Sequence, residues 1–251
     1  MNIAILTGAS SGLGQDFLKA LTSCDLDSIW IIARRAERLD SLASAFPNKS
    51  IIPLPLDITS KDDLIKLENK LKEEKPEVRL LINNAGKGLL SDFVTADGIA
   101  LSESIALNCN ALTLITRLTL PYMKKGSAVI NVSSIASFAP TSRMAVYGAT
   151  KSYVTSFSRA LREELKPRGI NVTVVCPGPM KTEFLPVAKI EKGKSTAFDY
   201  LPYCNPERVA KNAIKSAVRG KAVYTPTAFY KFYRLLAKIL PHALVVKFAK
   251  T

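Results

Sequence analysis

Residues 2–14, with the sequence NIAILTGASSGLG, decide the fold of this 251-residue chain. The apolar run at 3–7 is predicted to be a strand buried on both faces, and an amphipathic helix is predicted at about 12–23. Glycine allows a sharp turn and a close approach to a ligand, and a helix N-terminus offers free N–H groups to a pyrophosphate. We therefore predict that a dinucleotide-binding turn joins the two, formed by Gly8, Ser10, Ser11, Gly12, Leu13 and Gly14.

The alternation of short apolar runs and amphipathic stretches continues along the chain. Further strands are predicted at 28–33, 50–54, 79–83, 128–132, 171–176 and 222–224. Further helices are predicted at about 36–45, 60–74, 100–124, 146–166 and 206–219. This order indicates an α/β protein with a Rossmann-like, doubly wound, mostly parallel seven-stranded sheet and helices on both faces. No repeat or long linker interrupts it, so residues 1–251 are interpreted as one domain.

The first turn also admits other interpretations. It fits an ordinary glycine-rich turn, and residues 8–12 match the Gly-x-Ser-x-Gly pattern of the hydrolase nucleophile elbow. The hydrolase fold places that elbow after several strands, and the partner histidine would have to be His242, the one histidine of the chain. The position directly after the first strand favours the nucleotide interpretation.

Composition narrows the class of protein. Hydrophobic residues make up 47% of the chain, which argues against disorder. No apolar run is expected to reach the ~20 residues of a membrane-spanning helix. A strand that begins at residue 2 or 3 leaves no room for a targeting peptide, so we expect a cytoplasmic protein. Four cysteines without zinc spacing and a single histidine predict that no metal is bound.

The end of the second predicted strand carries Arg34 and Arg35 and no carboxylate. An acidic residue usually holds the ribose there when the cofactor lacks a 2′-phosphate, whereas a guanidinium can clamp a phosphate and stack on adenine. The pair therefore favours NADP(H) over NAD(H), against the plainer interpretation of two solvated arginines. Further cofactor contacts are predicted after the third, fourth and sixth strands, at Asp57, Ile58, Asn84, Ala85, Gly86, Pro177, Gly178 and Thr182. We expect Asp57 to bond the adenine amine, and Thr182 to bond the nicotinamide carboxamide or a phosphate.

Tyr147 and Lys151 stand one helical turn apart and follow Ser134 in the chain. Tyrosine has a reference pKa near ~10, and a lysine ammonium one turn away is expected to lower it. A tyrosine tuned in this way can give a proton to a carbonyl oxygen or take one from an alcohol. Chance alone supplies such a pair about once in a chain of this composition, so the interpretation depends on the motifs around it.

Together these motifs resemble the short-chain dehydrogenase/reductase family, in its single-domain type of this length. The glycine turn, the Asn-Asn-Ala-Gly segment at 83–86, the Ser-Tyr-Lys spacing and the Pro-Gly-x-x-x-Thr segment at 177–182 occur in order, within roughly residues 1–226. The resemblance implies that Ser134, not Ser133, orients the substrate oxygen. It also implies that Tyr147 is the acid or base, that Lys151 lowers its pKa and bonds the nicotinamide ribose, and that Asn108 holds a proton relay. Arg34 matches the basic position of NADP-preferring members.

The implied activity is hydride transfer between NADP(H) and a carbonyl or secondary alcohol, with a hydrophobic ketone as one candidate substrate. Two alternatives are open from the sequence. One is a non-catalytic NADP-binding regulator, against which the intact Ser-Tyr-Lys set argues. The other is an epimerase or dehydratase with the same Tyr-Lys pair, although such relatives are normally longer. Members are usually homodimers or homotetramers, joined through the helices near 100–124 and 148–166.

Two segments lie outside the strand–helix pattern. Residues 179–205 show weak periodicity and are interpreted as a substrate loop. Residues 227–251 form a basic, amphipathic tail in which Phe229, Phe232, Tyr233, Leu236, Ile239 and Leu240 are predicted to share one face. The net charge is +14, and the chain beyond 207 holds ten Lys or Arg and no Asp or Glu. The tail is predicted either to pack on the core or a subunit interface, or to contact an anionic membrane surface. No nucleic-acid partner is expected.

Overall fold

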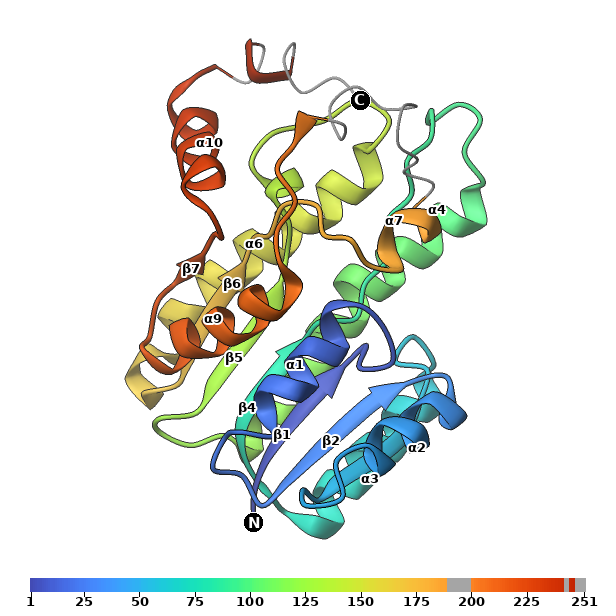
Figure 1. Cartoon of the computed structure of the whole chain (residues 1–251), viewed down its shortest axis with the longest axis vertical. Coiled ribbons are helices and arrows are strands. Elements are labelled where there is room, and N and C mark those ends of the chain that lie inside the picture. The colour runs from blue at the N-terminus through green and yellow to red at the C-terminus, as the bar shows by residue number, and fades with distance from the viewer. Residues whose placement is uncertain (189–199, 242–243, 247–251) are drawn as a thin grey trace.

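The computed structural model describes residues 1–188, 200–241 and 244–246. Their strands form one sheet in the order β3-β2-β1-β4-β5-β6-β7, in which all neighbours are parallel (Figure 1). The strands are β1 (Asn2–Thr7), β2 (Ser28–Ala33), β3 (Ile51–Pro55), β4 (Glu77–Asn83), β5 (Ala128–Val132), β6 (Asn171–Val175) and β7 (Val223–Tyr224). The predicted Rossmann-like sheet is confirmed, with strand bounds within two residues of those expected.

Helices cover both faces of the sheet. The α-helices described are α1 (Leu13–Leu21), α2 (Ala36–Ser44), α3 (Lys61–Glu74), α4 (Gly98–Ile105), α5 (Leu112–Thr119), α6 (Ala145–Leu165), α7 (Phe184–Val187), α9 (Pro206–Val218) and α10 (Ala228–Ile239). Alternate strand side chains point to opposite faces. Leu6 and Ile31 therefore pack with α1, α2 and α9, whereas Ile5 and Trp30 pack with α3, α5 and α6. Strands that are apolar on both faces explain the two helical layers.

The helix predicted at 100–124 is continuous but irregular. A π-helical turn (Ala106–Ala111) separates α4 from α5, and a 3₁₀ turn (Leu120–Tyr122) follows. By length and composition the rod Gly98–Tyr122 is long and apolar enough to cross a membrane, so the expectation that no stretch reaches this length is wrong. The rod packs against β4 and α6, which gives it a place in the helical layer of the sheet.

The order of the strands reverses between β1 and β4. The chain runs outward from β1 to β3 and then returns to β4 and proceeds to β7. In open α/β sheets the carboxyl ends of the two strands at such a switch point border the ligand crevice. Here those ends carry Thr7-Gly8 and Asn83-Asn84, and Asn84 donates from its side-chain amide to the carbonyl oxygens of Thr7 and Gly8, at 3.1 Å each. The fold thus places the glycine turn beside the Asn-Asn-Ala-Gly segment.

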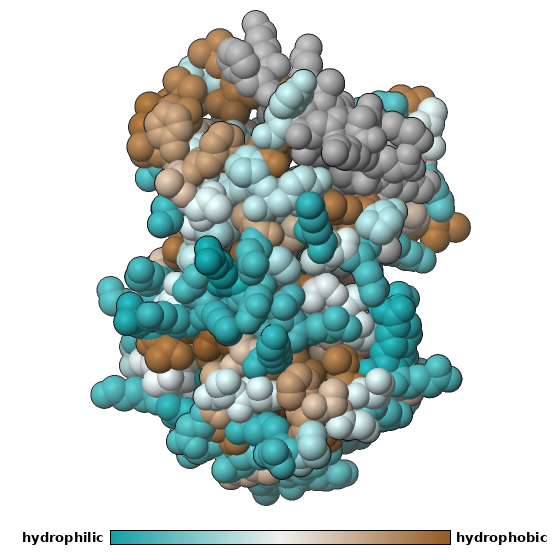
Figure 2. Space-filling model, viewed as in Figure 1, coloured by the Kyte–Doolittle hydropathy of each residue, from teal (hydrophilic) through white to brown (hydrophobic). Residues whose placement is uncertain are grey.

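The loop and the tail both lie at the carboxyl edge of the sheet. The N–H of Cys204 donates to the carbonyl of Pro179 at 2.8 Å, which joins the two ends of the segment predicted as a substrate loop. Beyond β7 the tail forms α10, which stands apart from the layers in Figure 1, and hydrophobic residues gather over it in Figure 2. Residues 189–199 of the loop, and His242 with the last residues of the tail, lie outside the described part of the chain.

Candidate active site

A cavity of about 1070 Å³ opens at the carboxyl edge of the sheet. Its wall includes the sequence-predicted residues Gly8, Ser10, Ser11, Gly12, Leu13, Arg34, Arg35, Asp57, Ile58, Asn84, Ala85, Gly86, Ser134, Tyr147, Lys151, Pro177, Gly178 and Thr182. Two predicted residues, Gly14 and Asn108, lie behind the wall instead. The structure thus brings the predicted cofactor and catalytic residues around one space.

The glycine turn leaves no room for side chains. Gly8 has φ +67°, and a Cβ there would lie 2.8 Å from the Cα of Ala85. A Cβ on Gly14 would lie 2.0 Å from the carbonyl oxygen of Gly8, because the first turn of α1 presses against the strand end. A Cβ on Gly12 would come within 3.2 Å of Thr182, which reaches the turn from the loop after β6. These bare backbone positions form a cradle at the N-terminus of α1, where anions are favoured.

Two arginines border the same cradle. Arg35 donates from Nη2 to the hydroxyl of Ser10 at 3.2 Å, so its guanidinium lies against the glycine turn. Arg34 is exposed at the cavity wall. Arg38 of α2 does not line the cavity, but its Nη1 lies 3.1 Å from a carboxylate oxygen of Glu183, which does. This ion pair links the arginine side of the cavity to the loop after β6.

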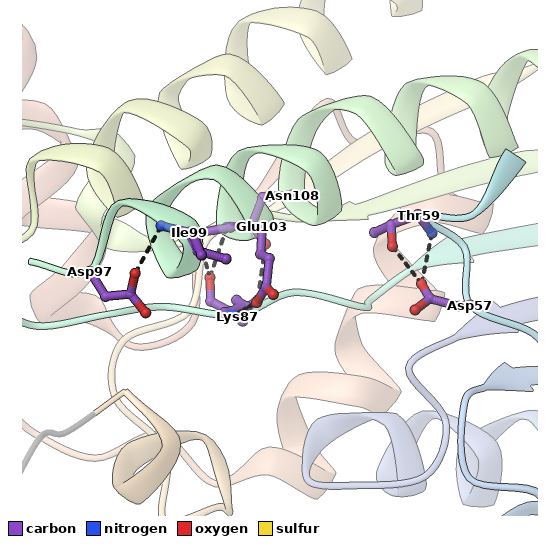
Figure 3. A network of polar contacts seen from close by, with 8 residues as sticks. Asp57, Thr59, Lys87, Asp97, Ile99, Glu103 and Asn108 are labelled. Carbon is purple, nitrogen blue, oxygen red and sulfur yellow. Dashed lines mark hydrogen bonds and ion pairs between the residues drawn. The ribbon is translucent and has the colours of Figure 1, made fainter.

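Asp57 lies at the cavity wall after β3. Its Oδ1 accepts from both the N–H and the hydroxyl of Thr59, at 2.9 and 2.6 Å, which closes a tight turn (Figure 3). The N–H of Asp57 is in turn held by Asp63 Oδ2 at 2.8 Å. These bonds fix the position of the carboxylate that the sequence assigns to the adenine amine.

Ser134 and Tyr147 meet in the structure, and Ser133 does not join them. Ser134 and Tyr147 both line the cavity, and the Ser134 hydroxyl caps a 3₁₀ turn by accepting from the N–H of Ala136. Ser133 turns toward α6, where its hydroxyl donates to the carbonyl of Lys151 at 2.8 Å. Of the two neighbouring serines, Ser134 is the one that interacts with the tyrosine side chain.

The expected lowering of the tyrosine pKa is wrong for the protein by itself. Burial raises the pKa of Tyr147 to about 12, and the Ser134 hydrogen bond opposes this rise. Tyr147 packs in a small apolar cluster with Leu90 and Met144, and its ring lies 5.8 Å from that of Phe184. Burial likewise lowers the pKa of Lys151 to about 8. Desolvation outweighs the attraction because the Lys151 ammonium lies 5.8 Å from the ring centroid and donates to the carbonyl of Val132 at 2.9 Å.

Asn108 lies in the π-helical turn and is almost fully buried. Its side-chain amide pairs with the backbone of Lys87, accepting from the N–H at 3.0 Å and donating to the carbonyl at 2.8 Å (Figure 3). A Cβ on Gly86 would lie 3.0 Å from Asn108 Oδ1 and 3.2 Å from Lys151 Nζ. Asn108 and Lys151 thus approach Gly86 together, and a π-helical turn often marks such functional positions.

The sequence suggested that a hydrophobic substrate could enter between the tail and the segment 179–205, but it did not predict which residues of the two face the cavity. Apolar residues of the loop and of the tail face it, namely Phe184, Leu185, Leu201, Phe229, Tyr233, Leu236, Leu240 and Val245. The helical periodicity of the tail was the available signal for these contacts. Of the six tail residues expected on one face, however, only four line the cavity. Phe232 and Ile239 are 60% and 68% exposed and do not line the cavity.

Among the described residues, no group of three or more His, Cys, Asp or Glu side chains could hold a metal ion. The chemistry of the site rests on hydroxyl, amine and amide groups, together with the backbone cradle.

Comparison with known proteins identifies the family of the chain. The model of the short chain dehydrogenase family matches residues 2–192. A probable NADP-dependent dehydrogenase of Haemophilus influenzae is 39% identical over 178 residues, covering 70% of each chain. Serine 3-dehydrogenase of Agrobacterium fabrum is 34% identical over 184 residues, covering 72% of each chain.

A solved structure resembles the whole chain. The short-chain dehydrogenase from Sphingobium yanoikuyae, in complex with NADPH, superposes with a TM-score of 0.78 at 28% identity, over 97% of this chain and 98% of that one. The match extends well past the part covered by the family model, into the segment that includes the tail. The chain therefore belongs to the short-chain dehydrogenase/reductase family and is an oxidoreductase acting on CH–OH groups.

Proposed function

We propose that the protein transfers a hydride between NADP(H) and a carbonyl or secondary-alcohol substrate. One observation carries the proposal: Ser134, Tyr147 and Lys151 face the same cavity as the glycine cradle and the two arginines. A proton-transfer group and a dinucleotide site in one space are what carbonyl reduction requires.

The cradle fits a dinucleotide. A side chain at Gly8 or Gly14 would fill the space beside the N-terminus of α1. A pyrophosphate in that space would accept hydrogen bonds from backbone N–H groups. Arg34 and Arg35 would bind a 2′-phosphate, which favours NADP(H) over NAD(H). Asp57 and Ile58 would border the adenine, Asn84, Ala85 and Gly86 the ribose next to it, and Pro177, Gly178 and Thr182 the nicotinamide end. The nicotinamide supplies the hydride when bound.

The catalytic residues then take the following roles. Ser134 orients the substrate oxygen, and Tyr147 gives it a proton in reduction or takes one in oxidation. A buried Tyr147 hydroxyl with a raised pKa stays protonated at neutral pH, as a general acid must. Lys151, which is charged at neutral pH, stabilises the phenolate that forms and holds the nicotinamide ribose. Asn108, beside Lys151 at Gly86, holds the relay that returns a proton to Lys151.

A pair of tyrosines on α6 provides the test. Tyr147→Phe should abolish NADPH oxidation with a panel of carbonyl compounds while NADPH still binds, because only the transferred proton is lost. Tyr153→Phe is the matched control, since Tyr153 is 41% exposed and bonds Thr113 outside the cavity. Full activity of the Tyr147→Phe protein would disprove the assignment.

The assembly and location are part of the same proposal. Ile99, Ile105 and Leu114 are large and exposed on the rod Gly98–Tyr122, which packs beside α6, and this suits a homodimer or homotetramer formed through these helices. Residues 1–251 act as one catalytic unit in the cytoplasm.

The outer side of α10, with Phe232 and Ile239 next to Lys231 and Lys238, suits peripheral contact with an anionic membrane surface. Sedimentation with anionic liposomes tests this contact, which Ile239→Ser should weaken.

A further inference from the structure

The catalytic cavity has an apolar end that hydride transfer itself does not require. This end is formed by the tail, through Phe229, Tyr233, Leu236, Leu240 and Val245. The tail follows β7, at the opposite edge of the sheet from β2 and β3, whose ends carry Arg34 and Asp57. The tail wall therefore lies on the substrate side of the cavity, away from the adenosine residues. None of its described lining residues is charged.

The helix α10 is fixed close to the reacting groups at two points. Tyr230 is fully buried, donates from its hydroxyl to the carbonyl of Pro202 at 2.6 Å, and covers Gly178 so closely that a Cβ there would lie 2.2 Å from its ring. One turn later, the ring of Tyr233 packs 5.9 Å from that of Phe138, which follows the 3₁₀ turn capped by Ser134. The wall is thus anchored to both loops that border the catalytic residues.

The apolar residues of α10 form two rows with different surroundings. The inner row, Phe229, Tyr233, Leu236 and Leu240, follows the four- and three-residue steps of one helix face and lines the cavity. The outer row, Phe232, Leu235 and Ile239, is 53% to 68% exposed and lines no part of the cavity. Leu235 and Leu236 are therefore chemically identical neighbours of which only one faces the site.

We infer that the substrate is a carbonyl compound with an extended apolar body that reaches from Tyr147 to the inner row of α10. This inference rests on the proposed function and specifies its substrate class. An apolar wall stabilises a bound chain in proportion to the apolar surface removed from water, about fourfold in affinity for each methylene. A small polar carbonyl compound would leave this wall without a partner.

A homologous series of methyl ketones, from 2-butanone to 2-dodecanone, tests the inference. We expect kcat/KM, followed by NADPH oxidation, to rise by up to about fourfold for each added methylene until the chain fills the apolar end. Leu236→Trp should reduce this rise and lower kcat/KM for the longest ketones by about tenfold or more. Leu235→Trp, the matched control, should keep the rise. Leu236→Ser is a second variant, and it should lower the gain per methylene without filling the cavity.

The outcomes separate the inference from the proposed function. If short and long ketones are reduced equally well, the inference fails and the proposed function stands. If no ketone is reduced by folded protein that binds NADPH, both fail. Equal losses in the Leu235 and Leu236 variants would contradict the assignment of the inner row. A measurement without turnover completes the test: with NADP⁺ present, which has no hydride to give, 2-dodecanone should raise the melting temperature of the native protein more than 2-butanone does, and an equal shift would overturn the inference.

Discussion

Gly178 lies beneath the ring of Tyr230, so that a methyl group at position 178 would stand 2.2 Å from the ring carbon Cε2. The loop after β6 and the helix that lines the apolar part of the cavity are thereby in direct contact. The Tyr230 hydroxyl extends this contact to Pro202, near the far end of the segment 179–205. Three segments distant in sequence thus meet at one tyrosine.

We predict that Gly178→Ala destabilises the protein by about 1–3 kcal/mol, because the buried ring must move to admit the methyl group. Thermal and chemical unfolding measure the change. Gly98→Ala is the control: a Cβ at Gly98 meets nothing within 4 Å, and Gly98 begins α4, so this variant should be neutral or slightly more stable. Equal stability of the two variants would show that the contact with Tyr230 is not restrictive.

The two neighbouring serines should differ in the kind of defect they produce. Ser134→Ala removes the hydroxyl that faces the cavity with Tyr147 and should lower kcat by about 10²–10³, the range found for a lost oxyanion donor. Ser133→Ala removes the hydroxyl that bonds the carbonyl of Lys151 and the hydroxyl of Thr155, and should mainly lower stability, by about 0.5–1.5 kcal/mol. Steady-state kinetics together with urea unfolding of both proteins distinguish the effects. A larger kinetic loss in Ser133→Ala would reverse the assignment.

Cofactor preference should depend on the arginines after β2. Arg34→Ala and Arg35→Ala should each raise the KM for NADPH by about tenfold or more and leave the KM for NADH little changed, because a charge-assisted bond to a phosphate contributes about 1.5–3 kcal/mol. Arg35 also bonds Ser10 in the glycine turn, so its loss is expected to have the wider effect. Parallel titrations with both cofactors give the answer, and equal losses for NADH and NADPH would remove the 2′-phosphate from the explanation.

Lys151 should make the stability of the folded protein depend on pH. Its pKa is lowered from 10.5 to about 8 in the folded chain, so between these values the unfolded chain holds a proton that the folded chain lacks. The free energy of unfolding therefore rises by up to about 3 kcal/mol as the pH increases from about 8 to about 10.5. The same contribution is lost as the pH falls from about 10.5 through about 8. Tyr147, whose pKa is raised to about 12, acts in the opposite direction only above about pH 10.

Urea unfolding at several pH values between about 8 and 10 measures this effect. Lys151→Met keeps the length of the side chain but carries no proton, so its stability should lack the rise seen in the native protein. Parallel curves for the two proteins would show that Lys151 is not titrating in this window.

The sequence was sufficient to predict the sheet and most of the residues that gather around the cavity, because both depend on local signals. Apolar runs at 3–7 and 128–132 predict buried strands, and the glycine spacing at 8–14 predicts a turn that only a close backbone approach explains. The Ser-Tyr-Lys spacing predicted which groups would meet. Each of these signals involves residues near one another in the chain or at equivalent strand ends.

What the sequence did not predict depends on contacts between distant segments. The direction of the Tyr147 pKa shift follows from its burial beside Leu90 and Phe184, which lie far from it in the chain. The π-helical turn places the side chain of Asn108 against the backbone of Lys87, a contact between segments that helical spacing alone does not reveal. Helical spacing showed that the tail is amphipathic, but it could not separate the inner row from the outer row. The two rows differ only because the burial of Tyr230 fixes the rotation of the helix.

The hydrogen bond between the N–H of Cys204 and the carbonyl of Pro179 has a consequence for how this protein diversifies. The bond closes the base of the segment 179–205, and within this closed segment the ring of Phe184 packs against that of Tyr147. A change in the composition of the segment would therefore alter the packing of the tyrosine as well as the cavity wall. A segment transplanted from a relative would have to retain Phe184 together with Pro179 and Cys204.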